Sequence, residues 1–571
     1  MHSDAIFTTV KSLVVFPILT GLFIGTSYIP FPPWAMLFGI APLAVAWARL
    51  AESASHETPL RPLLLRAFFL GWLAQFILNA IGFHWISHTA IEFGHFPTWA
   101  GILVLIGFCA VAHLYYGLAG AAALYVFLKL KRKAKLRNTS LPITYLIALS
   151  FAFFALFEHL WPAIFPWHLG YTWLWADLPG VQVSDLIGFE GLNLISLLTN
   201  ALFAIGWIKT MPLAETPTQI PTQTSTHRKR AFRNLGPALP WVGTALTVFF
   251  LINIFGLGRA DSWRPTDAAQ FKTLKIALIQ GNIGNYEKLI VEKQKDFANP
   301  IIETYLRLSR EAFAAHPDIT HVLWPETAFP DYLDPYFQHE PNRQVIQAFA
   351  QSSGRTIFTG AYSYEPSRKQ TFNGFFAMSS NGELLSSPYR KSILIPFGEK
   401  FPFSDIIPYM KWLFPGYGSF GQGDGPMAMD VVDFKLGPQI CLESLYPQFA
   451  AKTARLGAEV LSNVTNDSWF GRTFEPYQHM TMTLARAIEN RRPLLRATNT
   501  GITTVVLADG TKLQQSPIGK EWYGYYEVPY RANPPVVIYS RIAGYSPWLA
   551  AFLLVLIAAL ASRHVSRAKK A

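Results

Sequence analysis

Long apolar stretches, separated by short polar or basic segments, occupy the first 258 residues of the chain and recur near its end. They lie near 8–29, 33–50, 63–86, 99–128, 142–161, 191–210, 238–258 and 546–562. Each is close to the roughly 17 to 25 residues that a helix needs to cross a bilayer, so the pattern predicts eight transmembrane helices. The stretch 33–50 is at the short limit, and 99–128 is long enough to tilt or to project from the membrane.

The beginning of the chain allows a second interpretation, because an apolar stretch that follows Lys11 also fits a signal peptide. No clear small-residue cleavage site precedes the next stretch, so we interpret the first as a retained helix. Between the sixth and seventh stretches, the Thr-, Pro- and Gln-rich segment 212–227 is typical of a flexible linker.

The segment between the seventh and eighth apolar stretches has a different pattern. Short β-rich runs alternate with amphipathic stretches, which predicts an α/β domain. The β-rich runs are Leu274–Gln280, His321–Trp324, Thr356–Tyr362, Phe372–Met378, Val460–Val464 and Gly501–Leu507. Helices are predicted over 296–315 and 476–492, where apolar side chains recur at helical spacing. We therefore divide the chain into a membrane domain at 1–258, an α/β domain at 259–545, and a last helix with a basic tail at 546–571.

The overall composition also indicates a membrane protein. Of the 571 residues, 51% are hydrophobic and 15% are charged, whereas soluble domains carry about 25% charged residues. The apolar and aromatic content excludes a disordered chain. Two cysteines, Cys109 and Cys441, are too few for a disulfide scaffold in so long a chain.

The net charge of +12 by itself suggests an acidic partner. The positions of the Lys and Arg residues relative to the predicted helices favour another explanation. Outside 259–545, all nineteen Lys and Arg side chains fall on one side of the predicted helices, while the alternate segments near 30–32, 87–98 and 162–190 hold none. Cytoplasmic segments carry such an excess, so both termini are predicted to be cytoplasmic and the α/β domain to lie outside, in the periplasm of a bacterium with two membranes. The basic runs lack interleaved aromatic residues, which disfavours nucleic-acid binding.

Cys441 is the first candidate for chemistry. It follows the apolar run Gly437–Ile440 and precedes a helix-like stretch that begins near Tyr446. A thiol at such a junction meets the positive end of a helix dipole and backbone N–H groups, which favour a thiolate and can hold an oxyanion. By itself the pattern also fits an inert buried cysteine, and that is our interpretation of Cys109.

Two further segments carry side chains suited to acid–base chemistry. In Trp324–Thr327, Glu326 follows a β-rich run beside a tryptophan and a proline, where desolvation can raise a carboxyl pKa toward that of a general base. In Tyr389–Lys391, a lysine precedes the segment Pro396–Pro402, which contains Glu399. Taken separately, each segment also fits a solvated surface residue.

The order of these three segments within one α/β domain resembles the nitrilase, or carbon–nitrogen hydrolase, superfamily. The resemblance implies an αββα sandwich and a catalytic triad of Glu326, Lys391 and Cys441, which are separated by 65 and 50 residues. The whole chain, with membrane helices on both sides of this domain, further resembles the apolipoprotein N-acyltransferase family. Other segments that fit that family are Phe165–Trp167, Gln280–Ile283, Asn466–Gly471, Gln478–His479, Arg491–Pro493 and Asn499–Ile502.

The resemblance also implies a mechanism. Glu326 is expected to accept the proton of Cys441, which attacks a phospholipid acyl ester and forms a thioester. Lys391 and the Leu442 backbone N–H are expected to stabilise the oxyanion. The N-terminal α-amine of a diacylglyceryl-cysteine on an apolipoprotein then attacks the thioester and becomes an amide, which makes the reaction ping-pong.

Expectations about other groups follow from the same resemblance. Four residues are expected to support the triad, namely Glu399, Glu443, Asn373 and Trp469. Leu289 and Leu442 stand where some family members carry an aromatic residue, so a stacking role is lost there. The chemistry needs no cofactor and no metal. The expected partners are phospholipid, apolipoprotein and membrane lipids, with no nucleic acid, and we expect a monomer in the inner membrane.

Two features outside the triad also predict contact with lipid. The segment 401–428 places many aromatic and aliphatic residues among glycines and prolines, which predicts a mobile lid that admits lipid tails, with an ordinary buried loop as the alternative. Ionisable groups in or near the spans predict inward-facing polar sites, for which contact with lipid head groups and helix pairing both remain open. These groups are Glu158, His84, His113 and His159.

Two other functions fit part of the pattern. In a membrane-tethered amidase or nitrilase, water would resolve the thioester, but eight helices exceed what a tether needs. In a transporter with an external sensor domain, the three motifs would have no reason to be intact. Acyl transfer from phospholipid that depends on Cys441 distinguishes the predicted function from both.

Overall fold

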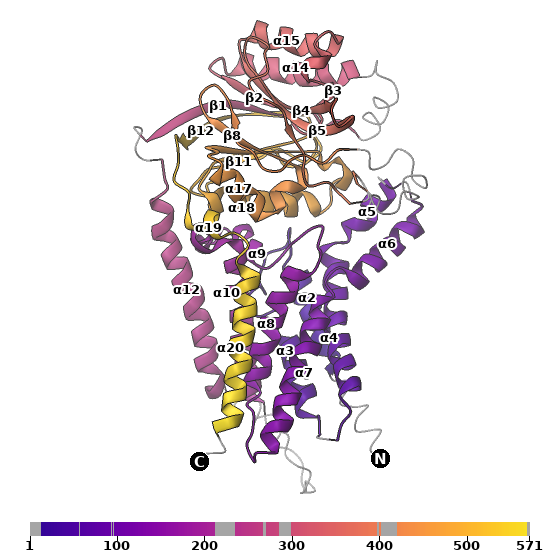
Figure 1. The fold of residues 1–571 in the computed structure, drawn as a ribbon, viewed down its shortest axis with the longest axis vertical. Helices are drawn as coiled ribbons and strands as arrows, with labels where there is room; N and C mark the ends of the chain where they lie inside the picture. The colour runs from indigo at the N-terminus through magenta and orange to yellow at the C-terminus, as the bar shows by residue number, and fades with distance from the viewer. Residues whose placement is uncertain are drawn as a thin grey trace.

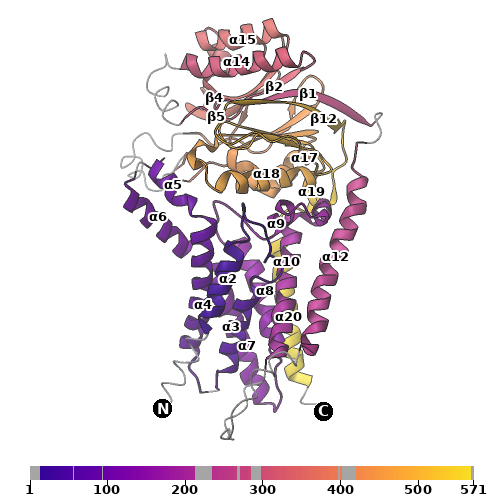
Figure 2. The same ribbon diagram turned by 180° about the vertical axis from the view of Figure 1, so that it is seen from behind.

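The computed structural model describes residues 13–55, 57–92, 94, 96–211, 235–265, 270–284, 298–396, 399–400 and 420–567. Figure 1 shows a helical bundle with an α/β sandwich at one end, and Figure 2 shows the same arrangement from behind. Three features named from the sequence lie outside the described residues: the linker 212–227, Leu289 and the greater part of the predicted lid, 401–419.

The bundle combines the N-terminal helices with the last helix of the chain, α20 (Ser546–Arg567), which packs against α7 and α8. The N-terminal helices are α2 (Val15–Gly25), α3 (Ala41–Glu52), α4 (Leu60–Gly82), α5 (Trp85–Glu92), α6 (Thr98–Val111), α7 (Tyr115–Lys135), α8 (Thr144–Leu160), α9 (Gly170–Trp175), α10 (Ser184–Thr210) and α12 (Leu239–Asp261). Among the described residues, five helical segments are long and apolar enough to cross a membrane: Leu60–Gly82, Thr98–Lys135, Pro179–Thr210, Gly236–Asp261 and Ser546–Ser566. These are the helices of an integral membrane protein.

Among the described residues, the structure supports five to seven apolar spans, where the sequence predicted eight over the whole chain. Two further helices, α2 and α8, are apolar but shorter, with 11 and 17 described residues. The predicted span 33–50 holds only the 12-residue helix α3, because prolines in Pro30–Pro33 disfavour a helix there and α3 begins at Ala41. The predicted span 99–128 divides at 112–114 into α6 and α7, and Figure 1 shows α6 leaning away from the bundle.

The α/β domain is a sandwich of two mixed sheets, and the first has the strand order β12-β1-β2-β4-β5-β6, with β3 paired to β4. Its strands are β1 (Phe271–Gln280), β2 (His321–Leu323), β3 (Phe329–Tyr332), β4 (Thr356–Glu365), β5 (Gln370–Met378), β6 (Tyr389–Arg390) and β12 (Trp522–Arg531). Strands β1, β2 and β4 are parallel, so the C-terminal ends of β1 and β2 lie at the same edge of the sheet. That edge carries the segment with Glu326.

The second sheet has the order β11-β10-β9-β8-β7, with β8, β9 and β10 parallel. Its strands are β7 (Met429–Asp430), β8 (Lys435–Ile440), β9 (Val460–Thr465), β10 (Leu494–Thr498) and β11 (Thr504–Val506). Helices α14 (Ala298–Ala315) and α15 (Pro341–Ser353) cover the outer sheet, and α17 (Pro447–Arg455) and α18 (Glu475–Asn490) cover the sheet nearer the bundle (Figure 1). The predicted αββα sandwich is therefore confirmed.

Basic segments meet at the end of the bundle that lies away from the sandwich. Lys131 Nζ donates a hydrogen bond to Ala51 O at 2.8 Å, which joins the end of α7 to the end of α3. Arg137, just beyond α7, donates to Ser566 Oγ in α20 at 3.1 Å. The predicted grouping of basic segments on one side is confirmed for these three helix ends.

Acidic residues at the opposite end of the bundle pair with basic residues of the sandwich. The fully buried Asp185, at the start of α10, accepts a hydrogen bond from Arg491 Nε at 2.9 Å. The exposed Asp177 lies 2.5 Å from Lys512 Nζ. Asp185 also pairs with Arg259 at the end of α12, at 2.8 Å, so this buried carboxylate links α10, α12 and the sandwich.

Helix α18 forms a second connection between the sandwich and the bundle. The buried side chain of Gln478 donates to Gly82 O at 2.9 Å and accepts from Trp85 Nε1 at 3.1 Å. Trp85 also packs against Phe470, with ring centroids 5.4 Å apart. Phe470 follows β9 by five residues, so this contact lies close to the segments that carry the candidate site.

Candidate active site

Cys441 lies at the point where β8 ends and the short 3-10 helix η5 (Cys441–Leu445) begins. Its backbone has φ +54°, a left-handed conformation that costs free energy for any residue with a side chain. Such strain is concentrated at functional positions, where surrounding structure holds it. Both Cys441 and the next residue, Leu442, are buried, at 4% and 5% exposure.

The position of Cys441 at the start of a short helix does not by itself make its side chain a thiolate. Burial and the negative charge of Glu326 raise the pKa of Cys441 well above its ordinary value, although Lys391 acts in the opposite direction. Helix η5 has only five residues, so its dipole is too short to outweigh the loss of solvation. Cys441 is therefore a thiol near pH 7 and needs a base before it can act as a nucleophile.

Glu326 follows β2 and is held from two sides. Asn373 Nδ2, in β5, donates to Glu326 Oε1 at 2.7 Å, and the backbone N–H of Asn466 donates to Oε2 at 2.9 Å. Gly360 in β4 makes room for this segment, because a Cβ there would lie 2.7 Å from Glu326 Cα and 2.6 Å from Thr327 N. The carboxylate is buried and its direction is set by main chain and amide groups.

Lys391 directly follows β6 and lies between two carboxylates. Its Nζ is 3.2 Å from Glu326 Oε1 and 2.7 Å from Glu399 Oε1, and the lysine side chain is fully buried. Burial lowers the pKa of Lys391, but the charges of Glu326 and Glu399 outweigh it and hold the pKa well above its ordinary value. Lys391 is therefore a fixed ammonium ion at neutral pH, placed to stabilise negative charge.

Glu443 joins the segment that carries Lys391 to the segment that carries Cys441. Its Oε1 accepts hydrogen bonds from the backbone N–H groups of Ser392 and Ile393, at 2.7 and 3.2 Å, and its Oε2 accepts one from Ile440 N at 2.7 Å. Tyr389 O–H donates to the same carboxylate at 2.6 Å. Ser392 O–H is a fifth donor, at 3.0 Å, and a buried carboxylate with five donors fixes the spacing of two catalytic candidates from different sheets.

Two other candidates from the sequence lie at the edge of this cluster. Trp469 lies in η6 (Asp467–Phe470) and is partly buried. From the predicted lid, the described end at 420–428 approaches Lys391, because Gly423 N donates to Lys391 O at 2.8 Å and Gln422 Nε2 donates to Ser392 O at 2.9 Å. The last residues of that segment are thus attached beside the candidate oxyanion donor.

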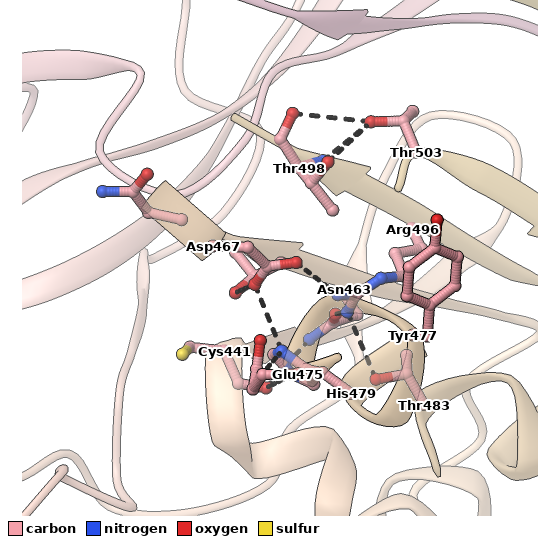
Figure 3. Close-up of polar contacts among 12 residues, drawn as sticks. Cys441, Asn463, Asp467, Glu475, Tyr477, His479, Thr483, Arg496, Thr498 and Thr503 are labelled. Carbon is pink, nitrogen blue, oxygen red and sulfur yellow. Dashed lines mark hydrogen bonds and ion pairs between the residues drawn. The ribbon is translucent and has the colours of Figure 1, made fainter. Parts of the chain in front are cut away.

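A buried polar network lies beneath the Cys441 main chain, as Figure 3 shows. Asn463 Nδ2 donates to Cys441 O at 3.1 Å, and Arg496 donates to Asn463 Oδ1. Arg496 also pairs with Asp467, at 2.8 Å, and His479 Nδ1 lies 3.1 Å from Asp467 Oδ1. The strained residue is therefore tied through its carbonyl oxygen to a fully buried ion pair.

This network was not predicted from the sequence. Asp467 and His479 were evident only as part of segments that fit the family, and nothing singled out Asn463 or Arg496. The available signal was a charged arginine inside the apolar run Leu494–Thr498, since an arginine is rarely buried unless it is paired.

The network contains side chains of the kinds that can bind metal ions. Asp467, Glu475 and His479 form the one group of potential metal ligands within 4.8 Å found in the part of the chain that the structure describes. Burial and the charge of Asp467 raise the pKa of Glu475 well above its ordinary value. Burial also acts to raise the pKa of Asp467, but Arg496 and His479 lower it to about 2. Asp467 is already paired with Arg496, and the positive charge of that arginine would repel a divalent cation at these three side chains.

Together these side chains bring a thiol, a carboxylate and an ammonium ion, three groups suited to acyl transfer, into one buried cluster. It contains a nucleophile, a carboxylate within electrostatic reach of it, a fixed ammonium ion, and a network that holds the nucleophile's main chain. A carbonyl attacked by Cys441 Sγ develops negative charge that Lys391 can stabilise.

Comparisons with known proteins agree with this arrangement. The carbon-nitrogen hydrolase family matches residues 275–528, and the apolipoprotein N-acyltransferase N-terminal domain matches residues 20–202. A solved carbon-nitrogen hydrolase from Helicobacter pylori is 18% identical, with a TM-score of 0.35 and coverage of 50% of this chain and 92% of that one.

Two relatives match almost the whole chain. The apolipoprotein N-acyltransferase of Bdellovibrio bacteriovorus is 39% identical over 547 residues, which cover 94% of this chain and 92% of that protein. The apolipoprotein N-acyltransferase of Geobacter metallireducens is 31% identical over 566 residues, which cover 96% of this chain and 95% of that protein. The chain belongs to the apolipoprotein N-acyltransferase family.

Proposed function

We propose that the protein transfers a phospholipid acyl chain to the N-terminal α-amine of a diacylglyceryl-cysteine on an apolipoprotein, through a thioester on Cys441. The observation that carries this proposal is the position of a buried, protonated Cys441 within reach of the charges of Glu326 and Lys391. Acyl transfer in two steps needs a nucleophile, a base and an oxyanion partner, and the site supplies all three.

In the first step, Glu326 accepts the Sγ proton as the sulfur attacks the ester carbonyl of the phospholipid. Lys391 and the Leu442 N–H stabilise the tetrahedral oxyanion, and donors of this kind contribute about 10²- to 10³-fold to rate in other acyl-transfer enzymes. The C–O bond then breaks, and Glu326 returns the proton to the oxygen of the departing lysophospholipid. A thioester remains on Cys441.

In the second step, the α-amine of the apolipoprotein attacks the thioester carbonyl and loses a proton to Glu326. The C–S bond breaks, an amide forms, and the proton returns to the Cys441 sulfur. Each step begins and ends with a neutral thiol or thioester and the same Glu326 carboxylate, so one base serves both half-reactions.

We further propose that the basic end of the bundle faces the cytoplasm and the sandwich faces the periplasm. The excess of Lys and Arg at the bundle end supports this orientation, because cytoplasmic segments of bacterial membrane proteins carry such an excess. The acidic residues at the other end, Asp177 and Asp185, pair with the sandwich. This orientation places the site on the side where an exported apolipoprotein would arrive.

The test is to incubate the purified full-length protein with acyl-labelled phospholipid and to look for a hydroxylamine-sensitive adduct. We expect the label on Cys441, its loss in Cys441→Ala, and its retention in Cys109→Ala, which alters the other cysteine, buried in α6. Addition of a diacylated lipopeptide should transfer the label to the peptide amine.

Two results would contradict the proposal. Label on a residue other than Cys441 would remove the thioester mechanism. Release of ammonia from small amides, without acyl transfer from phospholipid, would instead make the protein an amidase.

A further inference from the structure

The main chain of Cys441 lies beside a buried row of polar residues that crosses the second sheet. In the parallel strands β8, β9 and β10, Gln439, Asn463 and Arg496 stand next to one another in register. All three residues are fully buried. Burial of polar side chains costs free energy unless they are paired, so the partners of this row indicate what the row does.

Asn463 lies between Arg496 and the carbonyl oxygen of Cys441 (Figure 3). Its Oδ1 accepts a hydrogen bond from Arg496 Nη1, and its Nδ2 donates to Cys441 O at 3.1 Å and to Gln439 O at 3.3 Å. The reverse orientation of the amide would place its NH₂ group against the guanidinium and its oxygen against two carbonyl oxygens. Arg496 therefore fixes which atom of Asn463 faces Cys441.

A second chain of hydrogen bonds runs from Arg496 to the same carbonyl oxygen. Arg496 Nη1 donates to Thr483 Oγ1 at 3.3 Å, and the hydroxyl oxygens of Thr483 and Ser444 lie 2.7 Å apart. Ser444 Oγ donates to Cys441 O at 3.1 Å. A hydroxyl group has one hydrogen, so Thr483 is the donor to Ser444. Both chains therefore run from donor to acceptor in one direction, from the guanidinium to the carbonyl.

Asp467 holds the guanidinium in the orientation that both chains need. Its Oδ2 lies 2.8 Å from Arg496 Nη2, which leaves Nη1 for Asn463 and Thr483. Its Oδ1 accepts a hydrogen bond from Thr465 Oγ1 at 3.0 Å. The ion pair compensates the buried charge and directs Nη1 toward the two chains.

His479 approaches the same carbonyl but contributes less. Its Nε2 lies 3.4 Å from Cys441 O, and its Nδ1 lies 3.1 Å from Asp467 Oδ1. Burial and the charge of Arg496 lower the pKa of His479, so the ring is neutral at pH 7 and carries one N–H group. That group serves only one of the two acceptors, and the shorter contact is with Asp467. The Cys441 carbonyl is therefore held chiefly by Asn463 and Ser444.

The carbonyl of Cys441 and the N–H of Leu442 belong to one peptide group. This group is planar and trans, so its C=O and N–H bonds point in opposite directions. Side chains that fix the direction of Cys441 O therefore also fix the direction of the Leu442 N–H.

The backbone conformation of Cys441 makes this restraint necessary. Its φ of +54° lies in the left-handed region, whose cost is comparable to the contribution of one or two hydrogen bonds. Rotation of the adjoining peptide groups would relieve that strain. Loss of either chain to Cys441 O is therefore enough to let the Leu442 N–H turn away from its direction.

We propose that Arg496, Asn463 and Thr483 are positioning residues that direct the Leu442 N–H toward the oxyanion of the acyl group. The inference rests on the proposed function, in which that N–H stabilises the oxyanion. A donor that already points at the developing charge stabilises the transition state without reorganisation. The two chains also polarise the peptide group, because each hydrogen bond of a chain strengthens the next.

Two reactions of Cys441 separate the direction of the Leu442 N–H from the position of the thiol. Acylation by p-nitrophenyl acetate passes through a tetrahedral oxyanion, whereas alkylation by iodoacetamide displaces iodide and develops no charge on a carbonyl oxygen. Both rate constants are measured on the full-length protein in detergent at one pH, and Cys441→Ala gives the background. The ratio of acylation to alkylation then reports the oxyanion donor.

The variants Asn463→Leu and Thr483→Val each interrupt one chain and nearly keep the size of the side chain. In Asn463→Leu, Cys441 O keeps its hydrogen bond from Ser444. In Thr483→Val, the same oxygen keeps its hydrogen bond from Asn463. Melting temperatures show that each variant is folded.

Each variant has a matched control elsewhere in the sandwich. For Asn490→Leu, the native amide is fully buried, donates to Arg486 O at 2.9 Å and accepts from Ser540 Oγ at 2.8 Å. For Thr453→Val, the native hydroxyl is fully buried in α17 and donates to Phe449 O at 3.0 Å. These variants remove similar hydrogen bonds without touching the Cys441 carbonyl.

We expect Asn463→Leu and Thr483→Val to lower the ratio of acylation to alkylation about 10- to 100-fold. Complete removal of an oxyanion donor costs about 10²- to 10³-fold, and here the donor is misdirected rather than removed. Asn490→Leu and Thr453→Val should leave the ratio unchanged, even where their melting temperatures fall as far as those of the matched variants.

The proposal is overturned if acylation and alkylation fall together in the folded variants, since Asn463 and Thr483 would then only keep the cysteine in place. It is also overturned if neither rate constant changes. Failure of the proposed function has a different sign: the wild type would react with p-nitrophenyl acetate but form no thioester with phospholipid. The ratio would still test the direction of the Leu442 N–H.

Discussion

Glu326 and Lys391 form a buried ion pair, with Nζ and Oε1 3.2 Å apart and side-chain exposures of 7% and 0%. The two residues are 65 positions apart in the chain, and their pair joins the segment after β2 to the segment after β6. Because the same lysine is also paired with Glu399, the ammonium ion lies between two carboxylates. The cluster therefore carries a net negative charge, and this charge opposes ionisation of Cys441.

Replacing Glu326 should separate its charge from its role as a base. In Glu326→Gln, removal of the negative charge lowers the Cys441 pKa, because that charge raises it in the wild type. We expect the pH profile of alkylation by iodoacetamide to move to lower pH, while acyl transfer falls about 10²- to 10⁴-fold with the loss of the base. A profile that moves to higher pH would contradict the assigned electrostatics.

Gly360 should be required for the position of Glu326. The Cβ of Gly360→Ala would lie 2.7 Å from Glu326 Cα, so β4 or the glutamate segment must move. A displacement near 1 Å at a catalytic group costs about 100-fold in rate. Gly258→Ala, where a Cβ meets nothing within 4 Å, is the control and should keep full acyl transfer in the same assay.

Glu443 should contribute to stability as well as to activity. In Glu443→Gln, one oxygen becomes an NH₂ group that cannot accept from Ile440 N or from Ser392 N. We expect a loss of about 1–3 kcal/mol in the free energy of unfolding, seen as a lower melting temperature, together with slower acyl transfer. Glu311→Gln, which breaks an exposed pair with Arg307, should change the melting temperature little.

The Asp467–Arg496 pair should behave as a coupled unit. Asp467→Asn leaves the buried Arg496 charge without its partner, which costs about 3–5 kcal/mol. The double variant Asp467→Asn with Arg496→Met should lose less stability than the sum of the two single variants. Asp424→Asn breaks an exposed pair with Arg368 and should leave stability nearly unchanged; strict additivity of the first pair would refute the coupling.

The orientation across the membrane can be measured with introduced cysteines, because both native cysteines are buried. Leu136 lies at the basic end of the bundle and is 87% exposed, and Tyr336 lies in the sandwich and is 71% exposed. A membrane-impermeant maleimide should label Tyr336→Cys in intact cells with a permeabilised outer membrane. Leu136→Cys should react only after the inner membrane is opened; the reverse result would invert the proposed topology.

Much of the fold could be predicted from local patterns. The six β-rich runs all contain strands, and the helices expected at 296–315 and 476–492 appear as α14 and α18, with ends that differ by at most two residues. The ends of the membrane helices were less predictable, as α3 shows. Hydropathy gives the length of an apolar stretch, but it does not show where prolines prevent a helix from forming.

The residues of the site could also be predicted from the sequence, whereas their electrostatics could not. The residue types and order of Glu326, Lys391 and Cys441 were evident from the chain, as were Glu399 and Glu443 as candidates for support. Glu326 was expected to accept the Cys441 proton, but how strongly the site raises the Cys441 pKa was not evident, because that shift depends on burial and on two carboxylates brought from other strands. Motifs record residue identity, whereas a pKa depends on distance and solvation.

The sequence by itself determined which segments are apolar, which end of the bundle is basic, and which side chains can carry acyl transfer, because all three are properties of neighbouring residues. Only the tertiary structure decided how Asn463 and Arg496 hold the Cys441 main chain, and how Gln448 meets Glu190 across 258 residues of chain. A buried polar group needs a hydrogen-bond partner, because burial without one costs free energy. These partners are distant in the sequence, so only folding brings them together.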